Sequence, residues 1–398
     1  MPAADPAART VGPEGELRVT LAVAGGRVLR CSLTSTRPDV AGGLLQGRKV
    51  GEILLAVPRL FSICGASQAA ACELALAAAE GAAPTVDLLQ RCSAAVAAET
   101  LRETARRVLL DWPRALGEAP SAEAIAGARA AAGPTLQSGA VARAVFGVAA
   151  ADWLAQDTPQ ALHDWAAGGV TATARYLRAA LALPASDSAP VPLLPSPPQA
   201  AWLQQVLSAA QADTAFARRP VWQGAPAETG ALARGQADPL VAALLQGAML
   251  STAPGGSRRV ARPVARHVAR HVARHVARHV ARLRELARLL DGHLPVAAGA
   301  LALLDSDGQG DGDGVGEGVG WAENARGLLL HHVRVEHGRA TLYRIMAPTE
   351  WNFHPDGALA AAALGMTAQS EQVLRFRMAQ EIDSLDPCVS CEIQISDA

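Results

Sequence analysis

The sequence predicts a mostly helical α+β protein, and three observations lead to this fold class. Half of the 398 residues are hydrophobic and only 4% are aromatic, so Ala, Leu and Val dominate the apolar fraction and favour helices. From about 48 to 182 the apolar residues recur at mostly helical spacing. Two other segments, 16–34 and 328–346, have the pattern of β-hairpins. We expect one domain, 1–398, with a central helical bundle and small antiparallel hairpins at each end.

Each hairpin shows its own turn signal. The first strand of the amino-terminal hairpin alternates apolar and polar residues, and its apolar positions are Leu17, Val19, Leu21 and Val23. The chain then turns at Gly25-Gly26, a pair suited to the tight turns that require positive φ. The second hairpin is expected to turn at 336–339, and a final helix is expected at about 368–382.

Two segments are predicted to be irregular. Residues 184–199 are rich in proline and read as an extended, poorly ordered connector. Residues 304–320 are acidic and rich in glycine. The sixth position of this segment, counted from Asp305, is Gly310, as in a calcium-binding EF-hand loop, but the twelfth is Gly316 where such a loop needs Glu. We therefore expect a loop there and no calcium site.

Residues 260–282 form a tandem repeat: Val-Ala-Arg-Pro once, Val-Ala-Arg-His four times, then Val-Ala-Arg. On a helix a period of four advances ~400°, so each residue type forms a slowly drifting stripe. One stripe has a spacing able to chelate nickel or zinc, and it consists of His267, His271, His275 and His279. The arginine stripe could bind nucleic acid or an acidic partner. We favour a third interpretation, in which duplication has lengthened a solvated helix, and nucleic-acid binding is not expected.

Net charge, apolar runs and cysteine content argue against several classes of protein. The formal net charge of −1 gives no general attraction to nucleic acid or membrane. The first residues lack the basic and apolar regions of a signal peptide, and no apolar run is long enough to span a bilayer. Six scattered cysteines are too few for a disulfide scaffold in a chain of this length. We expect a cytoplasmic protein without membrane partners.

The candidate metal ligands are thiols. Cys388 and Cys391 are three residues apart, a spacing that lets two sulfurs bind one soft metal ion, and Cys64 is a third candidate far upstream. The alternatives are a pair of buried thiols or a thioredoxin-like redox pair, although the latter lies at a helix start after a strand. The remaining cysteines have apolar neighbours and are expected to be packed thiols: Cys31, Cys72 and Cys92.

Three groups of residues around these thiols resemble the nickel-iron hydrogenase large subunits. Residues 348–352 (Pro-Thr-Glu-Trp-Asn), followed by a helix and 386–391 (Asp-Pro-Cys-x-x-Cys), resemble the carboxyl-terminal end of that family. Residues 323–327 (Glu-Asn-Ala-Arg-Gly) are similar to its Glu-x-x-Arg-Gly segment. The first hairpin, Gly47-Arg48 and 64–67 (Cys-Gly-x-Ser) follow the order of its amino-terminal region. The resemblance covers about 15–75 and 320–394 and implies the large-subunit fold.

The departures from the family pattern argue against catalysis. Serine stands at 67 where the family has its second amino-terminal cysteine, and a neutral hydroxyl is a poor ligand for a soft metal. Other family residues are also absent, since this chain has Gly42 for a proton-transferring glutamate, Ser62 for arginine, Ala71 for histidine and Gln394 for the terminal histidine. Three ligand thiols remain, Cys64, Cys388 and Cys391, which suit transient holding of one metal fragment. We expect no enzyme activity.

This incomplete pattern resembles the hydrogenase accessory proteins called HupK or HoxV. The resemblance implies an assembly scaffold that carries iron with cyanide and carbonyl ligands to the hydrogenase large-subunit precursor, together with other hydrogenase accessory proteins. Nickel is a second metal that the thiols suit. By the same resemblance Arg326 and Thr349 line the pocket for the diatomic ligands, since both side chains donate hydrogen bonds. The alternatives are a metal-free docking chaperone, a catalytic or sensory hydrogenase subunit, and a nucleic-acid binder.

Overall fold

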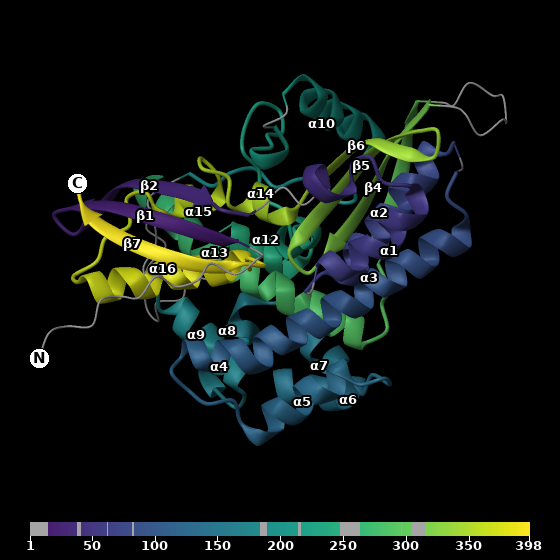
Figure 1. Cartoon of the computed structure of the whole chain (residues 1–398). Coiled ribbons are helices and arrows are strands. Elements are labelled where there is room, and N and C mark those ends of the chain that lie inside the picture. Colours follow the sequence, from purple (N-terminus) through teal and green to yellow (C-terminus); the bar gives the residue numbers. More distant parts are fainter. Residues whose placement is uncertain are drawn as a thin grey trace, which may run out of the picture.

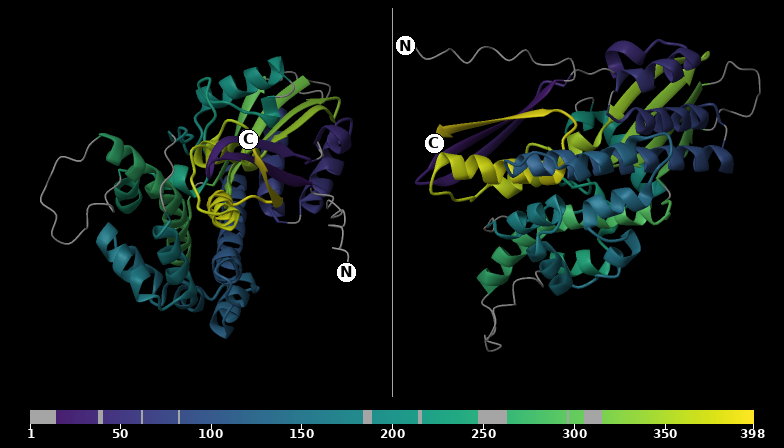
Figure 2. Two further views of the ribbon diagram at one scale, coloured as in Figure 1. Left: turned by 90° about the vertical axis from the view of Figure 1, so that its left-hand side faces the viewer. Right: turned by 90° about the horizontal axis from the view of Figure 1, so that it is seen from below.

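The computed structural model describes residues 15–37, 41–61, 63–81, 83–183, 189–213, 216–246, 263–295, 297–304 and 315–398, without the side chains of 41, 212, 263–273 and 304. Figure 1 shows two small sheets above a bundle of helices, with the long helix α3 running between them. Figure 2 shows from two further sides that the bundle lies on one side of the sheets. The predicted α+β class, mostly helical with a bundle and small hairpins, is confirmed.

The expected helical stretch from about 48 to 182 is confirmed as a series of mostly short helices, and further helices follow it along the chain. The helices are α1 (Val50–Leu60), α2 (Gly65–Ala79), α3 (Val86–Arg106), α4 (Trp112–Ala115), α5 (Ala122–Ala132), α6 (Ser138–Phe146), α7 (Ala150–Leu154), α8 (Pro159–Gly168), α9 (Ala172–Leu181), α10 (Ala200–Ala212), α11 (Ala231–Gly235), α12 (Pro239–Leu245), α13 (Pro263–Leu290), α14 (Pro348–Asn352), α15 (Ala358–Ala363) and α16 (Glu371–Leu385), with short π or 3-10 turns η1 (Ala41–Leu45), η2 (Arg107–Asp111) and η3 (Phe216–Arg218). Within the described residues, no helix is both long and apolar enough to cross a bilayer.

The first sheet joins the two ends of the chain. Strands β1 (Glu16–Ala24) and β2 (Arg27–Ser35) form the expected hairpin, and Gly25 and Gly26 adopt φ of 57° and 73° in its turn. Strand β7 (Ser390–Asp397) pairs with β1 in parallel, so the sheet has the order β2-β1-β7. Figure 1 shows β7 in yellow beside β1 in purple. Strand β7 was not predicted from the sequence, although the alternation of Cys391, Ile393 and Ile395 is a strand signal.

The second sheet is an antiparallel meander of β3 (Ala298–Leu304), β4 (Val315–Asn324), β5 (Gly327–Glu336) and β6 (Arg339–Met346). The hairpin predicted at 328–346 is confirmed as β5 and β6. The loop predicted at 304–320 is wrong at its end, because residues 315–320 form β4; residues 305–314, with the candidate calcium loop, lie outside the described residues.

The glycines of β4 allow helix α2 to pack closely against the strand and do not mark a loop. A β-carbon built on Gly320 would stand 2.1 Å from the carbonyl oxygen of Ala71 in α2, and one on Gly318 would stand 2.5 Å from the nitrogen of Ala79. Only glycine allows the helix backbone to approach the strand this closely. This contact fixes α2, which begins immediately after Cys64, against the sheet.

The tandem repeat is not a solvated helix, so that interpretation is wrong for its described part. Helix α13 runs through the bundle, and its polar repeat residues are at most 9% exposed: Arg274, His275, Arg278, His279 and Arg282. Arg274 and Arg278 each bind the buried carboxylate of Glu228. Burial of arginine is tolerated here because such carboxylates compensate the charge.

The proline-rich connector is anchored where the structure describes it. Leu194 donates its backbone N–H to the carbonyl oxygen of Glu228 (2.9 Å), and Glu228 donates to that of Pro192 (2.9 Å). The side chain of Leu194 is only 1% exposed. Residues 189–199 therefore contradict the expected poor order, whereas 184–188 lie outside the described residues.

The α2–β4 contact predicts that Gly318→Ala destabilises the fold. The added methyl group meets backbone atoms of α2, which cannot rotate away, so we expect a loss of about 2–3 kcal/mol or more in the free energy of unfolding. Urea unfolding measures this loss. The matched control is Gly51→Ala in α1, where nothing lies within 4 Å, and it should be neutral or stabilising by up to about 1 kcal/mol. Equal effects of the two substitutions would contradict the packing argument.

Candidate functional site

The fold brings together thiols that lie more than 300 residues apart in the sequence. Cys64 lies at the amino-terminal end of α2, Cys388 lies between α16 and β7, and Cys391 lies in β7. A charge on Cys388 raises the pKa of both other thiols, which places Cys388 near each of them. Cys64 and the carboxyl-terminal pair of cysteines therefore lie in one region, and their service as metal ligands stays a prediction.

The thiols are not preassembled as a metal centre. Among the described residues, no three His, Cys, Asp or Glu side chains are grouped closely enough to hold a metal ion. None of the six cysteines forms a disulfide. Burial, as the largest cause, raises the pKa of Cys64 and of Cys391 to about 12, so both thiols are protonated at neutral pH. Metal binding to these side chains requires release of those protons and a small rearrangement.

Thr349 touches the site directly. It lies in the one-turn helix α14, and its Oγ1 is 3.3 Å from Cys388 Sγ, within hydrogen-bonding range for sulfur. Asn352, in the same turn, holds this segment by accepting the backbone N–H of Thr229 (2.9 Å) and donating to the carbonyl oxygen of Arg326 (3.2 Å). The hydroxyl expected near the metal ligands is thus fixed beside one of them.

Arg326 is a buried permanent charge at the turn between β4 and β5. Its guanidinium bonds Glu103 (Nη2 to Oε2, 3.3 Å) and lies 3.8 Å from Asp386 Oδ1. Burial lowers its pKa but these acids overcome that effect, and charges on Cys64 and Cys388 raise the pKa further. The group therefore stays charged within electrostatic reach of both thiols, where it can attract an anionic ligand.

Ser67 stands where the resemblance puts a family cysteine. Its side chain is hydrogen-bonded to a carboxylate that was not predicted from the sequence. Its hydroxyl donates to Glu99, a residue of α3, and is fully buried. Glu99 also accepts the backbone N–H groups of Ala66 (2.7 Å) and Ser67 (3.3 Å), so it caps the positive end of α2. Burial raises the pKa of Glu99. No local pattern in the sequence marks Glu99.

A buried hydrogen-bond chain leads to Cys64 from the interior. Gln68 donates from Nε2 to Cys64 Sγ (3.7 Å), and its Oε1 lies 2.8 Å from His331 Nε2. His331 Nδ1 lies 2.8 Å from the hydroxyl of Tyr343, which also bonds Cys72. Burial lowers the pKa of His331 to about 3, so the ring is neutral. Its Nε2 must then donate to Gln68 and its Nδ1 accept from Tyr343, so the donors all point toward Cys64.

The histidine stripe of the repeat does not form a metal site where it is described. The rings of His275 and His279 are T-shaped with centroids 4.9 Å apart. His279 lies T-shaped against the stacked rings of Trp112 and Tyr176, at 5.1 and 5.2 Å, while His275 pairs with Glu381. The side chains of His267 and His271, like Ser62, lie outside the described residues. The packed-thiol expectation holds for Cys72 and Cys92, which are buried, whereas Cys31 is half-buried.

Comparisons with known proteins show the family of the chain. A family model described as nickel-dependent hydrogenase matches residues 196–394. The chain is 30% identical over 401 residues to the hydrogenase expression/formation protein HoxV of Cupriavidus necator, covering 92% of this chain and 93% of that protein. It is 30% identical over 381 residues to the hydrogenase expression/formation protein HupK of Rhizobium leguminosarum bv. viciae, covering 94% and 95%.

The fold also matches solved structures. A chain of the reduced Ni-Fe-Se hydrogenase from D. vulgaris Hildenborough superposes with a TM-score of 0.55 at 17% identity, covering 92% of this chain and 95% of that chain. This likeness shows a shared fold. Together with the identity to full-length relatives, it establishes that the chain belongs to the HoxV/HupK family of hydrogenase expression/formation proteins, which has the fold of the Ni-Fe-Se hydrogenases.

Proposed function

We propose that this chain is a maturation factor for nickel-iron hydrogenase, which binds the iron fragment with its cyanide and carbonyl ligands as cargo and passes it to the large-subunit precursor. The observation that carries the proposal is Cys388, bonded to Thr349 and close to both Cys64 and Arg326. Thiols, a hydroxyl and a guanidinium thus lie in one region of a hydrogenase-like fold.

The chemistry of these side chains suits such cargo. Cys64, Cys388 and Cys391 offer soft thiolates for iron, and nickel is a second metal that they suit. Arg326 and Thr349 supply N–H and O–H donors for the nitrogen atoms of cyanide. Because Ser67 is bonded to Glu99, it does not supply a fourth ligand, and the cargo keeps an open coordination position. Holding and release fit this site better than turnover, so we propose that the protein is not an enzyme.

The partners follow from the cargo. We propose that the large-subunit precursor receives the iron fragment and that other hydrogenase accessory proteins supply it, all in the cytoplasm. Arg274 and Arg278 are buried against the carboxylate of Glu228, so this described part of the arginine stripe does not face a nucleic acid.

A second function, a metal-free docking chaperone for the large subunit, is favoured by one observation. The described side chains include no three metal ligands grouped closely enough for an ion. A chaperone of this kind would keep the fold but would not depend on the thiols. Replacement of the thiols therefore separates the two functions.

Cys388→Ser is expected to abolish cargo binding, because serine oxygen is a poor ligand for a soft metal. In protein purified anaerobically from cells that make hydrogenase, iron content and the cyanide and carbonyl infrared bands should fall about tenfold or more, with a matching loss of hydrogenase maturation. Cys31→Ser is the matched control and should change neither, because Cys31 is a half-buried thiol that packs against the same apolar cluster as Cys388 and Cys391 but is not a candidate ligand. Normal maturation with Cys388→Ser would favour the docking chaperone.

Gln68→Leu is expected to slow alkylation of Cys64 by about fivefold at a fixed alkaline pH. The amide N–H stabilises the thiolate, so its removal, at a cost of roughly 1 kcal/mol, raises the pKa of Cys64 and lowers the reactive fraction. Peptide mass spectrometry of iodoacetamide-treated protein measures the rate. Tyr343→Phe, which changes only the far end of the chain of donors, should have a smaller effect. Faster alkylation of Cys64 in Gln68→Leu would show that the amide does not serve its sulfur.

A further inference from the structure

The segment 384–391, here called the cysteine arm, connects α16 to β7 and carries both carboxyl-terminal thiols. At its start Asp386 adopts a left-handed backbone conformation with φ of 54°, which is unfavourable for a residue with a side chain. Asp386 is 4% exposed and pairs with Arg107 of η2 and with Arg326. A segment in this conformation needs support from its surroundings to stay in place.

Two arginines of the repeat supply that support. Arg282 donates from Nη2 to the carbonyl oxygen of Ser384 (3.0 Å), and Arg278 donates from Nη1 to the hydroxyl of the same serine (3.1 Å). Arg278 also bonds Glu381 (2.9 Å), one turn earlier on α16. Because the repeat has a period of four, these arginines lie on the same face of α13 and meet α16 together.

The same face of α13 also contacts Glu228, which links it to the turn of Arg326 and the helix of Thr349. Arg274 and Arg278 bind the two carboxylate oxygens of Glu228 at 3.0 and 2.9 Å. Burial opposes ionisation of this carboxylate, yet the two guanidinium groups hold its pKa at about 2. The next residue, Thr229, accepts the backbone N–H of Leu328 on its hydroxyl (2.9 Å) and donates its own N–H to Asn352. Glu228 thus ties the repeat to the turn of Arg326 and to the helix of Thr349.

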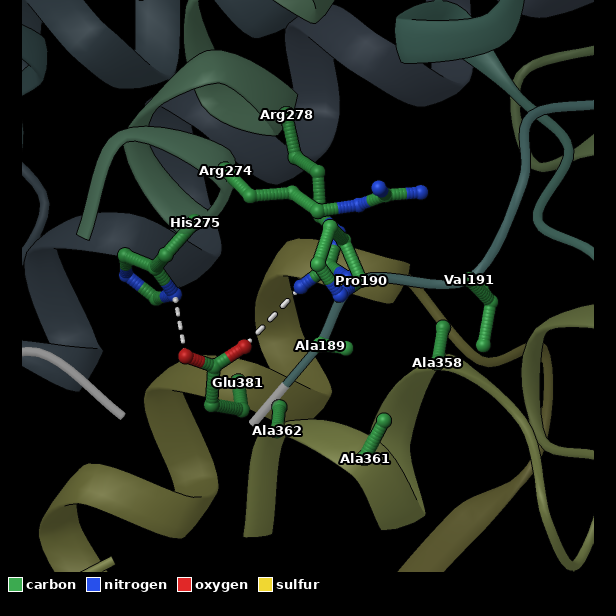
Figure 3. A pocket seen from close by; sticks show the side chains of 10 residues that line it. All are labelled: Ala189, Pro190, Val191, Arg274, His275, Arg278, Ala358, Ala361, Ala362 and Glu381. Atoms are coloured by element: carbon green, nitrogen blue, oxygen red, sulfur yellow. Dashed lines mark hydrogen bonds and ion pairs between the residues drawn. The ribbon is translucent and has the colours of Figure 1, made fainter. Parts of the chain in front are cut away.

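Figure 3 shows this junction, with Arg274, His275 and Arg278 above Glu381. His275 Nδ1 lies 3.4 Å from Glu381 Oε1 and Arg278 bonds the other oxygen, so one carboxylate joins a histidine and an arginine of the repeat to α16. Ala189, Pro190, Ala358 and Ala361 close the small pocket around these groups. The contacts are polar, buried and directional, which is what a rigid support requires.

We infer that Arg278 and Arg282 are positioning residues that hold the cysteine arm, so that the carboxyl-terminal part of the repeat, 272–282, is a component of the candidate site. The inference rests on the proposed function only for the reason why Cys388 must be held in place. The support itself is a property of the chain and can be tested without cargo.

Identical repeat units make the inference specific. Residues 272–282 consist of two copies and a final Val-Ala-Arg, and two further copies occupy 264–271. Deletion of 264–271 leaves every residue of 272–282 unchanged, so the arm should keep its support. Deletion of all four copies, 264–279, moves Pro263 into the place of His279, inside the buried helix, where proline breaks the backbone hydrogen bonding.

The test compares two arginines of the same helix. Arg282→Met removes the donor to Ser384 together with a buried charge, so global stability should change little. The arm should open more often, and alkylation of Cys388 and Cys391 by iodoacetamide in cargo-free protein should rise about fivefold, as expected for the loss of roughly 1 kcal/mol. The matched control is Arg284→Met, whose guanidinium bonds Asp238 (2.9 Å) and Leu154 (2.7 Å) away from the arm. Because this change breaks a buried ion pair, it should lower the free energy of unfolding, yet under native conditions it should leave both alkylation rates unchanged.

Further variants distinguish a positioning role of Arg282 from a general loss of stability. Arg282→Lys keeps a donor and should restore most of the protection, and Cys31 serves as an internal reference for global unfolding. The deletion of 264–271 should react like the full chain. Equal alkylation of Cys388 in Arg282→Met and Arg284→Met, or no change in either, would overturn the inference.

The outcome is independent of cargo binding. If alkylation rises in Arg282→Met but the unaltered protein carries no iron and no cyanide or carbonyl bands, the positioning role stands and the proposed function fails. If the unaltered protein carries those bands and Arg282→Met leaves alkylation of Cys388 unchanged, the proposed function stands and the positioning role fails.

Discussion

The parallel pairing of β7 with β1 is the constraint on which the site depends. It places Cys391 opposite Leu17 in register and so brings the last residues of the chain beside the first hairpin. Successive residues of a strand face opposite sides of a sheet, so a slip by one residue would turn Cys391 away from its present surroundings. Cys388, three residues earlier, lies where the chain leaves α16 and approaches Thr349 and Cys64. The register of one strand thus determines where two candidate ligands lie.

Buried charges provide the second layer of support. Asp386, at the start of the cysteine arm, meets Arg107 and Arg326, and although burial opposes its ionisation these arginines hold its pKa below the usual value. The repeat arginines extend the same pattern to Glu228 and Glu381. Buried ion pairs add little net stability but are costly to break, so they define one arrangement among several compact ones. For a site assembled from distant segments, that specificity matters more than stability.

The candidate site differs from the catalytic pattern of the family in its contacts as well as in its residue types. Ser67 is not merely a weaker ligand, because its hydroxyl is committed to Glu99 at the end of α2. Burial raises the pKa of Cys64 and of Cys391, and the described side chains are not grouped for an ion, while Arg326 and Thr349 are already fixed beside the thiols. Under the proposed function, the groups that would recognise the outer ligands of the iron fragment are preorganised, whereas the candidate metal ligands must adjust. This order suits a protein that accepts and releases a fragment.

The sequence by itself determined the class of fold, both hairpins, and the residues of the candidate site, because glycine turns, alternation and the spacing of Cys388 and Cys391 are local features. Only the tertiary structure decided which of these features are buried and what they touch. The repeat was predicted to be a solvated helix, and residues 315–320 of β4 to be a loop. Composition does not reveal that Glu228 faces the repeat or that the backbone of α2 packs against β4. Glu99 and His331 carry no motif, and their roles arise from contacts with residues far away in the chain. Long-range contacts, which no local period encodes, turned scattered residues into a site.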